Sequence, residues 1–354
     1  MPTAAILKPD SRVRLDRERL EIVGPEEGVD GDSLLREIPL RDVDRLILSE
    51  QVQITSQAMG EVLRREIPVI WLDSHGHVLG NFLPPPPAHG AARLRQYQRV
   101  LDSQFGLEMA GRIITAKIYN QRRVLQRLLA SRRSESSSSD DPANRALGTA
   151  KFESVDDTIR WMDALFSSLK TASNFDELRG YEGVSTARYF SAWATFLPPE
   201  FPFESRSTRP PLNPVNACIS FGATLLYQEF VAACHARGLD PALGMLHTTE
   251  DRRWSLALDL MEPFRPVFVE ALALDCFSHQ MLNEKHFEPR KGGVYLNEEG
   301  RRKFLLQYER RMERQFLSES AGHRTTLRQQ IDLQTAQFKT SLDAPSAFEP
   351  FLMN

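Results

Sequence analysis

The sequence predicts an α+β protein in which a small, mainly-β N-terminal domain precedes a larger, all-helical domain. Three observations support this: apolar and charged residues alternate near the N-terminus, prolines cluster at residues 84–92, and helical periodicity begins after them. A length of 354 residues is sufficient for two domains. We therefore expect a β-rich domain at residues 1–88 and a helical domain at residues 89–320.

Four N-terminal segments alternate apolar with polar residues or form short apolar runs between turn residues. This pattern is typical of strands with at least one buried face. The segments that we expect as strands are residues 11–24, 46–48, 67–73 and 78–83. Residues 53–67 have helical spacing instead, with Thr55 or Ser56 as N-cap, so this domain also contains one short helix.

The prolines of residues 84–92 (PPPPAHGAA) predict a stiff linker, because proline lacks the backbone donor that helices and strands use. Residues 93–133 then form one broken helix or two. Later helices are expected at residues 154–173, 180–196, 213–237, 264–282 and 297–317. The serine-rich residues 134–146 predict a flexible loop, and residues 321–354 predict a polar tail that is frayed or disordered.

Composition and charge exclude several classes of protein. The chain is 41% hydrophobic and 26% charged, and its net charge of −3 gives no global basic field for a polyanion. Its three scattered cysteines, without a C-x-x-C motif, fit a reducing compartment and buried apolar positions. We find no signal peptide and no apolar run long enough to cross a bilayer, and we expect a cytoplasmic protein without membrane contact.

The stretch SLALDLMEPFRP, residues 255–266, carries acids within an apolar run. Asp259 and Glu262 are three residues apart and would share a helix face, while Pro263 favours a kink or a new helix start. Two carboxylates at a helix irregularity suit a hard metal ion. The alternative is that they cap the following helix and pair with Arg265.

Two further residues are candidates for the same chemistry. Glu182 begins a helical segment, where glutamate often only complements the helix dipole, and His247 follows an apolar run, where histidine is often a structural hydrogen-bonding group. Two carboxylates and a neutral imidazole form a ligand set for Mg²⁺ or Mn²⁺, and the imidazole favours Mn²⁺. Spacing does not test the grouping, because the residues come from different segments.

Eight motifs occur in the order found in one protein family. They are SRVRLDRERL, IPLRDVDRLIL, VQITSQAM, IPVIWLDSHGHVLG, YEGVSTARYF, RPPLNPVNACISFGATLLY, LGMLH and SLALDLMEPFRP. On these motifs, from about residue 5 to about residue 315, the chain resembles the universal CRISPR-associated adaptation endonuclease. That family is the metal-dependent integrase that inserts new spacers into a CRISPR array.

The resemblance implies a divalent-metal-dependent DNA endonuclease and strand transferase. Such an enzyme joins the 3′-hydroxyl ends of captured spacer DNA to the array by transesterification, which is a phosphoryl transfer. By motif, the metal ligands and catalytic residues are Glu182, His247 and Glu262, with Mn²⁺ or Mg²⁺ as the cofactor. Asp259 matches an additional acid that would orient His247 or a metal-bound water.

The resemblance also implies partners, and the sequence departs from the family motifs at two positions. The partners are double-stranded DNA, a second copy of the chain bound largely through the N-terminal domain, and the small second CRISPR adaptation protein. An iron–sulfur exonuclease trims the incoming DNA in some systems, and this chain lacks the cysteine set for such a cluster. Asn213 stands where the family has aspartate, which puts an ionic role there in doubt, and Ile219 stands where it has leucine.

DNA would have to bind to local basic patches, because the net charge is negative. Candidate phosphate contacts are Arg188, Arg252, Arg253, Arg265, Arg122, Arg123 and Arg127. Each has the alternative of a solvated surface group, and the Arg252–Arg253 pair is favoured because its neighbours are the proposed ligands. Tyr189 and Trp254 would stack on a base or pack in the core.

Two other functions remain open at this point. One is a metal-dependent nuclease that acts on branched DNA in repair, with integration as a secondary activity. The other is a DNA-holding subunit without catalysis, which the complete set of Glu182, His247 and Glu262 disfavours.

Overall fold

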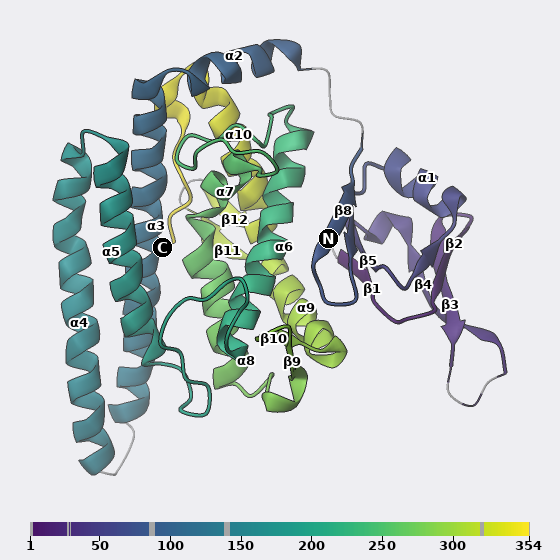
Figure 1. Cartoon of the computed structure of the whole chain (residues 1–354), viewed down its shortest axis with the longest axis horizontal. Helices are drawn as coiled ribbons and strands as arrows, with labels where there is room; N and C mark the ends of the chain where they lie inside the picture. The colour runs from purple at the N-terminus through teal and green to yellow at the C-terminus, as the bar shows by residue number, and fades with distance from the viewer. Residues whose placement is uncertain are drawn as a thin grey trace.

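The computed structural model describes residues 3–26, 28, 30–84, 89–137, 142–318 and 322–353, and the side chains of these except within residues 135–152. A mainly-β part at the N-terminus and a larger helical part lie side by side (Figure 1). The predicted fold class, α+β with a β-rich N-terminal region before a helical one, is confirmed.

The N-terminal part contains two four-stranded sheets and a helix. The first sheet has the order β1 (Thr3–Ile6), β5 (Arg45–Ser49), β7 (Val69–Leu72), β8 (Val78–Phe82). The second has the order β4 (Asp32–Pro39), β3 (Arg19–Pro25), β2 (Arg12–Asp16), β6 (Gln53–Ile54). Helix α1, Ser56–Arg64, begins after Thr55, whose hydroxyl accepts a hydrogen bond from Ala58 N at 3.2 Å, as expected of an N-cap.

Strand β5 shows how the first sheet joins the two parts of the molecule. Successive side chains of a strand point to opposite faces, so Leu46 and Leu48 pack into the N-terminal core while Ile47 packs into the helical core. Arg45 of the same strand forms a buried ion pair with Glu229 of helix α6, Pro214–Ala236. The sheet therefore forms a layer against the helical part.

The helical part is built around α6, most of whose side chains are buried. The other α-helices are α2 (Gly90–Val100), α3 (Ser103–Ser137), α4 (Pro142–Thr171), α5 (Phe175–Ala194), α7 (Ser255–Met261), α8 (Ala271–Ser278), α9 (Glu298–Glu313) and α10 (Leu327–Ser341). Residues 93–133 thus belong to two helices, α2 and α3. In Figure 1, α4 and α5 pack on the side of α3 that faces away from the β-rich part.

The two departures from the family motifs, Asn213 and Ile219, lie at the start of α6 and within it. This helix is also more apolar than expected. Asn213 is its N-cap and accepts a hydrogen bond from Asn216 N at 2.8 Å, a role that asparagine and aspartate fill about equally well. Ile219 is buried. By length and composition alone α6 could cross a membrane, contrary to expectation, but 67% of its apolar window is buried inside the fold, which makes this weak evidence.

We expected the second part of the chain to be all-helical, but it also contains strands. It contains the hairpins β9 (Phe287–Arg290) to β10 (Gly293–Leu296) and β11 (Phe316–Ser318) to β12 (His323–Thr325). The first hairpin turns at Lys291 and Gly292, whose φ angles of 46° and 76° are those that two-residue hairpin turns require. The Lys-Gly turn was therefore the sequence signal for this hairpin.

Two predicted boundaries also shift. The flexible loop expected at residues 134–146 is flanked closely by helices, because α3 continues to Ser137 and α4 begins at Pro142, followed by helix-favouring alanine, arginine and leucine. The centre of this loop, residues 138–141, lies outside the described residues, as do residues 85–88 of the predicted linker.

The expectation of a disordered tail at residues 321–354 is wrong for the described residues 322–353. Helix α10 buries Leu327, Ile331 and Phe338, which lie on one face at helical spacing. The segment after it buries Phe348 and Phe351, whose exposed fractions are 0% and 2%. The many polar residues of this region lie between a few large apolar ones that complete the core.

We predict that Phe351→Ala lowers the free energy of unfolding by about 3–5 kcal/mol, because it leaves a cavity in the core. The Phe351 ring stacks on Phe264 with a centroid distance of 4.7 Å. Urea unfolding followed by circular dichroism measures the change. Leu352→Ala is the matched control, since Leu352 is 47% exposed and should change stability by less than about 0.5 kcal/mol. Equal small effects in both variants would contradict an ordered C-terminal segment.

Candidate functional site

A cavity of about 390 Å³ in the helical part brings the predicted ligands together. Glu182 of α5, His247 of the loop before α7, and Glu262 directly after α7 all line it. The remaining lining residues are Arg179, Leu246, Thr248 and Arg253. Three segments that are distant in sequence therefore share one opening in the fold.

Lys117 of α3 lies between the two carboxylates, although no sequence pattern had singled it out. Its Nζ atom is ion-paired with Oε1 of Glu182 and lies 2.5 Å from Oε2 of Glu262. Only 6% of the Lys117 side chain is exposed, so water contributes little to holding its charge. Burial alone would lower the pKa of Lys117, but the carboxylates of Glu262 and Glu182 reverse that effect and raise it.

Glu262 faces two cations through different oxygens. Oε1 accepts a hydrogen bond from Arg265 Nη1 at 2.9 Å, and Oε2 faces Lys117. Burial would raise the pKa of the Glu262 carboxyl, but Arg265 and Lys117 more than offset burial and hold that pKa well below its usual value. Oε2 is buried and has the Lys117 ammonium as its ionic partner, so its negative charge depends on a cation at this position.

Asp259 holds His247 and the loop that carries it. The buried Asp259 carboxylate accepts hydrogen bonds from the backbone N–H groups of Met245, Leu246 and His247, at 2.5, 2.9 and 2.9 Å. Its Oδ1 also lies 2.6 Å from Nδ1 of His247. The loop approaches so closely that a Cβ atom at Gly244 would lie 2.8 Å from Asp259 Oδ2.

The hydrogen bond to Asp259 has two consequences for His247. It fixes Nδ1, so Nε2 is the ring nitrogen that remains for a ligand in the cavity. Burial would lower the pKa of His247, but the hydrogen bond to Asp259 and its charge raise it overall. The predicted role of Asp259 in orienting His247 agrees with this contact.

The helix irregularity expected near Pro263 is present. Helix α7 ends at Met261, and a π-helical segment, Pro266–Glu270, separates it from α8. The Asn120 side chain of α3 donates hydrogen bonds to the carbonyls of Pro263 and Phe351, at 2.6 and 2.9 Å. The break that presents Glu262 is therefore fixed by α3 and by the C-terminal segment.

The arrangement is not a closed metal centre. In the part of the chain that the structure describes, no three His, Cys, Asp or Glu side chains form a group that could hold a metal ion. The physical reason is that Lys117 stands between Glu182 and Glu262, and that Asp259 is engaged with backbone amides. The predicted ligands thus share a cavity without sharing one coordination sphere.

The arginines predicted to contact phosphates near the cavity behave differently from one another. Arg253 lines the cavity and is held by Thr248 and by Glu250, whose carboxylate lies 2.9 Å away. Arg252 is exposed, with a φ angle of 67°. Arg265 is 22% exposed and its Nη1 pairs with Glu262 at 2.9 Å, and its contact with a phosphate stays a prediction.

The remaining candidates lie on α3 and α5. Arg188 is exposed and stacks over Trp161, 4.4 Å from the ring centroid. The α3 arginines have protein contacts or arginine neighbours: Arg122 is ion-paired with Asp163, Arg123 donates to Gln126, and Arg127 lies near Arg123.

Only one of the two predicted stacking residues has the surface that stacking requires. Tyr189 is fully buried beside Glu270, so the alternative of core packing is correct and a role in stacking on a base is wrong. Trp254 is 40% exposed and packs edge-on against His235. Its exposed face remains a candidate for contact with a base.

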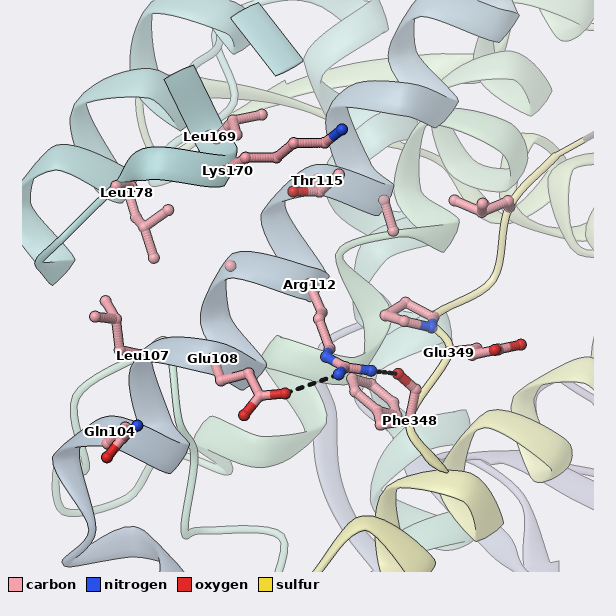
Figure 2. A pocket seen from close by; sticks show the side chains of 15 residues that line it. Gln104, Leu107, Glu108, Arg112, Thr115, Leu169, Lys170, Leu178, Phe348 and Glu349 are labelled. Carbon is pink, nitrogen blue, oxygen red and sulfur yellow. Dashed lines mark hydrogen bonds and ion pairs between the residues drawn. The ribbon is translucent and has the colours of Figure 1, made fainter. Parts of the chain in front are cut away.

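A larger cavity of about 810 Å³ lies elsewhere on α3, beside the start of α5 and the C-terminal segment (Figure 2). Arg112 there donates hydrogen bonds to Glu108 and to the Phe348 carbonyl, as Figure 2 shows. None of Glu182, His247 and Glu262 lines it. Size alone therefore does not identify the chemical site, whereas the convergence of charged groups does.

Sequence and structure comparisons now identify the family. The family model described as CRISPR associated protein Cas1 matches residues 4–310, so the chain belongs to the Cas1 family. The CRISPR-associated endonuclease Cas1 1 of Thermus thermophilus is 31% identical over 348 residues, which cover 97% of this chain and 94% of that protein. The match to relatives thus extends into the C-terminal segment that the family model does not reach.

A second relative is a fusion protein. The CRISPR-associated exonuclease Cas4/endonuclease Cas1 fusion of Geobacter sulfurreducens is 33% identical over 316 residues. These residues are 88% of this chain but 53% of the fusion, so the chain spans about half the length of that relative.

Solved structures show the same fold. A Cas1 protein from Thermotoga maritima superimposes with a TM-score of 0.73 at 24% identity, covering 97% of each chain. A casposase bound to an integration product superimposes with a TM-score of 0.79 at 22% identity, covering 98% of this chain and 91% of that one. At these identities the likeness concerns the fold alone.

We predict that Asp259→Asn lowers the free energy of unfolding by about 2 kcal/mol or more, because the amide replaces one acceptor with donors that face backbone N–H groups. Urea unfolding measures the loss, and hydrogen exchange at the amides of Met245 and Leu246 should accelerate. Asp251→Asn is the control, since Asp251 is exposed in the same loop. Unchanged exchange at both amides would show that Asp259 does not hold the loop.

Proposed function

We propose that this chain is a divalent-metal-dependent DNA endonuclease and integrase that joins 3′-hydroxyl ends of captured DNA to a CRISPR array. The observation that carries the proposal is the cavity in which Glu182 and Glu262 face a shared cation while His247 lines the same space. Family membership supports the reaction class, since relatives are named as Cas1 endonucleases and one structural neighbour is a casposase bound to an integration product.

The donor set fits Mn²⁺ or Mg²⁺. Glu262 Oε2 and Glu182 Oε1 both face the position that the Lys117 ammonium occupies, and His247 has one fixed and one remaining ring nitrogen. Carboxylate oxygens suit both ions, and the imidazole favours Mn²⁺. When bound by these residues, the ion would polarise the phosphoryl oxygen and stabilise the charge that develops during attack.

In the proposed reaction the 3′-hydroxyl oxygen of the incoming DNA forms a bond to a phosphorus of the array backbone. The bond from that phosphorus to another 3′ oxygen breaks, and this oxygen takes up a proton while the attacking hydroxyl gives one up. One phosphodiester thus replaces another, and the number of diesters is unchanged. Asp259 keeps the His247 ring in place, and Arg265 keeps the Glu262 carboxylate oriented during this exchange. With water as the nucleophile, the same site would cleave DNA.

DNA binding in this proposal uses the loop that carries His247. Arg253 lines the cavity and Arg252 is its exposed neighbour, so both lie beside the proposed ligands. The exposed Trp254 follows them directly and presents a ring face for an unpaired base. Phosphates that approach the cavity would meet these groups first.

The proposed partners follow from the family and from the names of relatives. We propose that two copies of the chain associate largely through the N-terminal domain and that they work with the small second adaptation protein. A structure described as a Cas6-RT-Cas1–Cas2 complex contains a chain of this fold. The Cas4/Cas1 fusion relative supports cooperation with a Cas4-type exonuclease that trims the incoming DNA.

We predict that His247→Ala and Glu262→Gln each abolish Mn²⁺-dependent strand transfer, because each removes one proposed ligand. Transfer of a labelled 3′-hydroxyl oligonucleotide into a repeat-bearing plasmid measures the activity, and circular dichroism confirms the fold. Glu200→Ala is the control, because Glu200 is exposed and does not line the cavity. Full activity in both ligand variants would rule out the assignment, and faster turnover of branched DNA than insertion by the unaltered chain would favour a repair nuclease.

We predict that replacing Arg252 and Arg253 together by alanine weakens DNA binding and reduces the slope of log affinity against log salt by about 1 to 2 units. Each lost phosphate contact releases about one counterion fewer, so the effect should not depend on DNA sequence. Fluorescence anisotropy over a salt series measures the slope. Arg41→Ala is the control, with an 82% exposed side chain in the N-terminal part. An unchanged slope in the double variant would exclude this patch.

A further inference from the structure

The cation that lies between the carboxylates of Glu182 and Glu262 is a side chain of the protein itself, Lys117. Glu182 lies on α5 and Glu262 follows α7, so their negative charges approach one another only because the fold brings these helices together. Glu262 is 4% exposed and Glu182 is 30% exposed, and two negative charges that face one cavity repel each other. The Lys117 ammonium neutralises one of these charges and pairs with both groups.

We propose that Lys117 is an internal counter-cation that holds the site together without metal and is displaced when a divalent ion binds. This inference rests on the proposed metal-dependent function and adds a residue that the ligand motifs do not contain. The ammonium group lies against the oxygens of Glu182 and Glu262 that would bind the ion. One position between two carboxylates does not accommodate both cations, because they repel each other and need the same lone pairs.

The contacts of Glu262 show which cation would leave. Arg265 binds Oε1 at 2.9 Å, whereas Lys117 lies 2.5 Å from the other oxygen, Oε2, and is also ion-paired with Glu182. The Arg265 contact can therefore persist while the Lys117 contact is exchanged for a metal–oxygen bond. A lysine side chain has four rotatable carbon–carbon bonds, so its ammonium can withdraw without movement of α3.

The structure also explains why a positive residue is needed at this place in the absence of metal. The Glu262 side chain is 4% exposed, and an ionised carboxylate buried without enough positive charge is strongly destabilising. The positive charge of Lys117 already offsets part of the negative charge of Glu182 and Glu262, as a bound ion would do. The lysine thereby stabilises the metal-free protein and weakens metal binding by the same interaction.

The test compares Mn²⁺ binding by the full chain and by Lys117→Met, using isothermal titration calorimetry. Methionine keeps an unbranched side chain, one atom shorter than lysine, and removes its charge. We expect the dissociation constant for Mn²⁺ to fall about tenfold or more, since a competing positive charge has gone. Lys303→Met is the control, because Lys303 pairs with Glu299 on α9, does not line the cavity, and should leave the constant unchanged.

Thermal unfolding provides a second readout that does not depend on activity. We expect Lys117→Met to melt below the unaltered chain without metal, and to gain more in Tm from saturating Mn²⁺ than the unaltered chain does. Lys117→Arg keeps the positive charge and should bind Mn²⁺ no more tightly than lysine. Lys117→Gln also removes the charge but keeps a polar group, so it replaces the methionine variant in calorimetry if that variant is too unstable, with the same tighter binding expected.

The outcomes separate this inference from the proposed function. If the unaltered chain binds Mn²⁺ and Lys117→Met binds it equally or more weakly, the counter-cation role is overturned while the metal site stands. If neither protein binds Mn²⁺, both the inference and the proposed metal site fail. Tighter binding by Lys117→Met, lost again on adding His247→Ala, supports both.

Discussion

The repulsion between the carboxylates of Glu182 and Glu262 is the constraint on which the site depends. Both groups face one cavity of the helical part, and Glu262 is almost completely buried. Such a pair persists only when positive charge lies close by, and here Lys117 and Arg265 supply it. The charged core of the site is thus balanced by side chains of the chain itself, and a bound metal ion would replace part of that balance.

The surrounding fold fixes these charges in place. A π-helical segment after α7 turns Glu262 towards the cavity, and Asn120 binds the carbonyls of both Pro263 and Phe351. Gln334 of α10 donates a hydrogen bond to the Leu260 carbonyl at 2.6 Å. The C-terminal residues that follow the stretch matched by the family model therefore support the helix that presents Glu262.

The Asp259 side chain makes several of the contacts that hold the loop carrying His247. Asp259 accepts three backbone hydrogen bonds from this loop and a fourth contact from the imidazole. A motif in which aspartate precedes glutamate by three residues therefore has two separate tasks: Asp259 positions a neighbouring loop, and Glu262 faces the cavity. This division of roles resolves the question of why an apolar helix carries two acids.

Patterns within short segments of the sequence predicted those strands and helices that depend on neighbouring residues alone. Alternation in residues 11–24 predicted strands β2 and β3, and the Thr55 cap predicted the start of α1. Contacts between distant segments were not predictable in this way. In residues 322–353, Leu327, Ile331 and Phe338 do share a helix face, but the core that they complete comes from distant segments.

The proposed ligands came from motifs, whereas Lys117 was missed because its partners belong to other segments. One signal did exist: Lys117 lies at helical spacing from the buried Ile113, Ile114 and Asn120, so it places a charge on the buried face of α3. A lysine in such a position requires a buried partner of opposite charge. The identity of that partner became apparent only when α5 and the segment after α7 were packed against α3.

The most direct measurement is a crystal structure of the full chain soaked in Mn²⁺, with anomalous scattering recorded to locate the ion. We expect one anomalous peak in the cavity, bound by Glu182, His247 and Glu262, with the ammonium of Lys117 withdrawn from between the carboxylates. A peak away from these three residues, or an ion-free cavity with Lys117 unmoved at saturating Mn²⁺, would contradict the account.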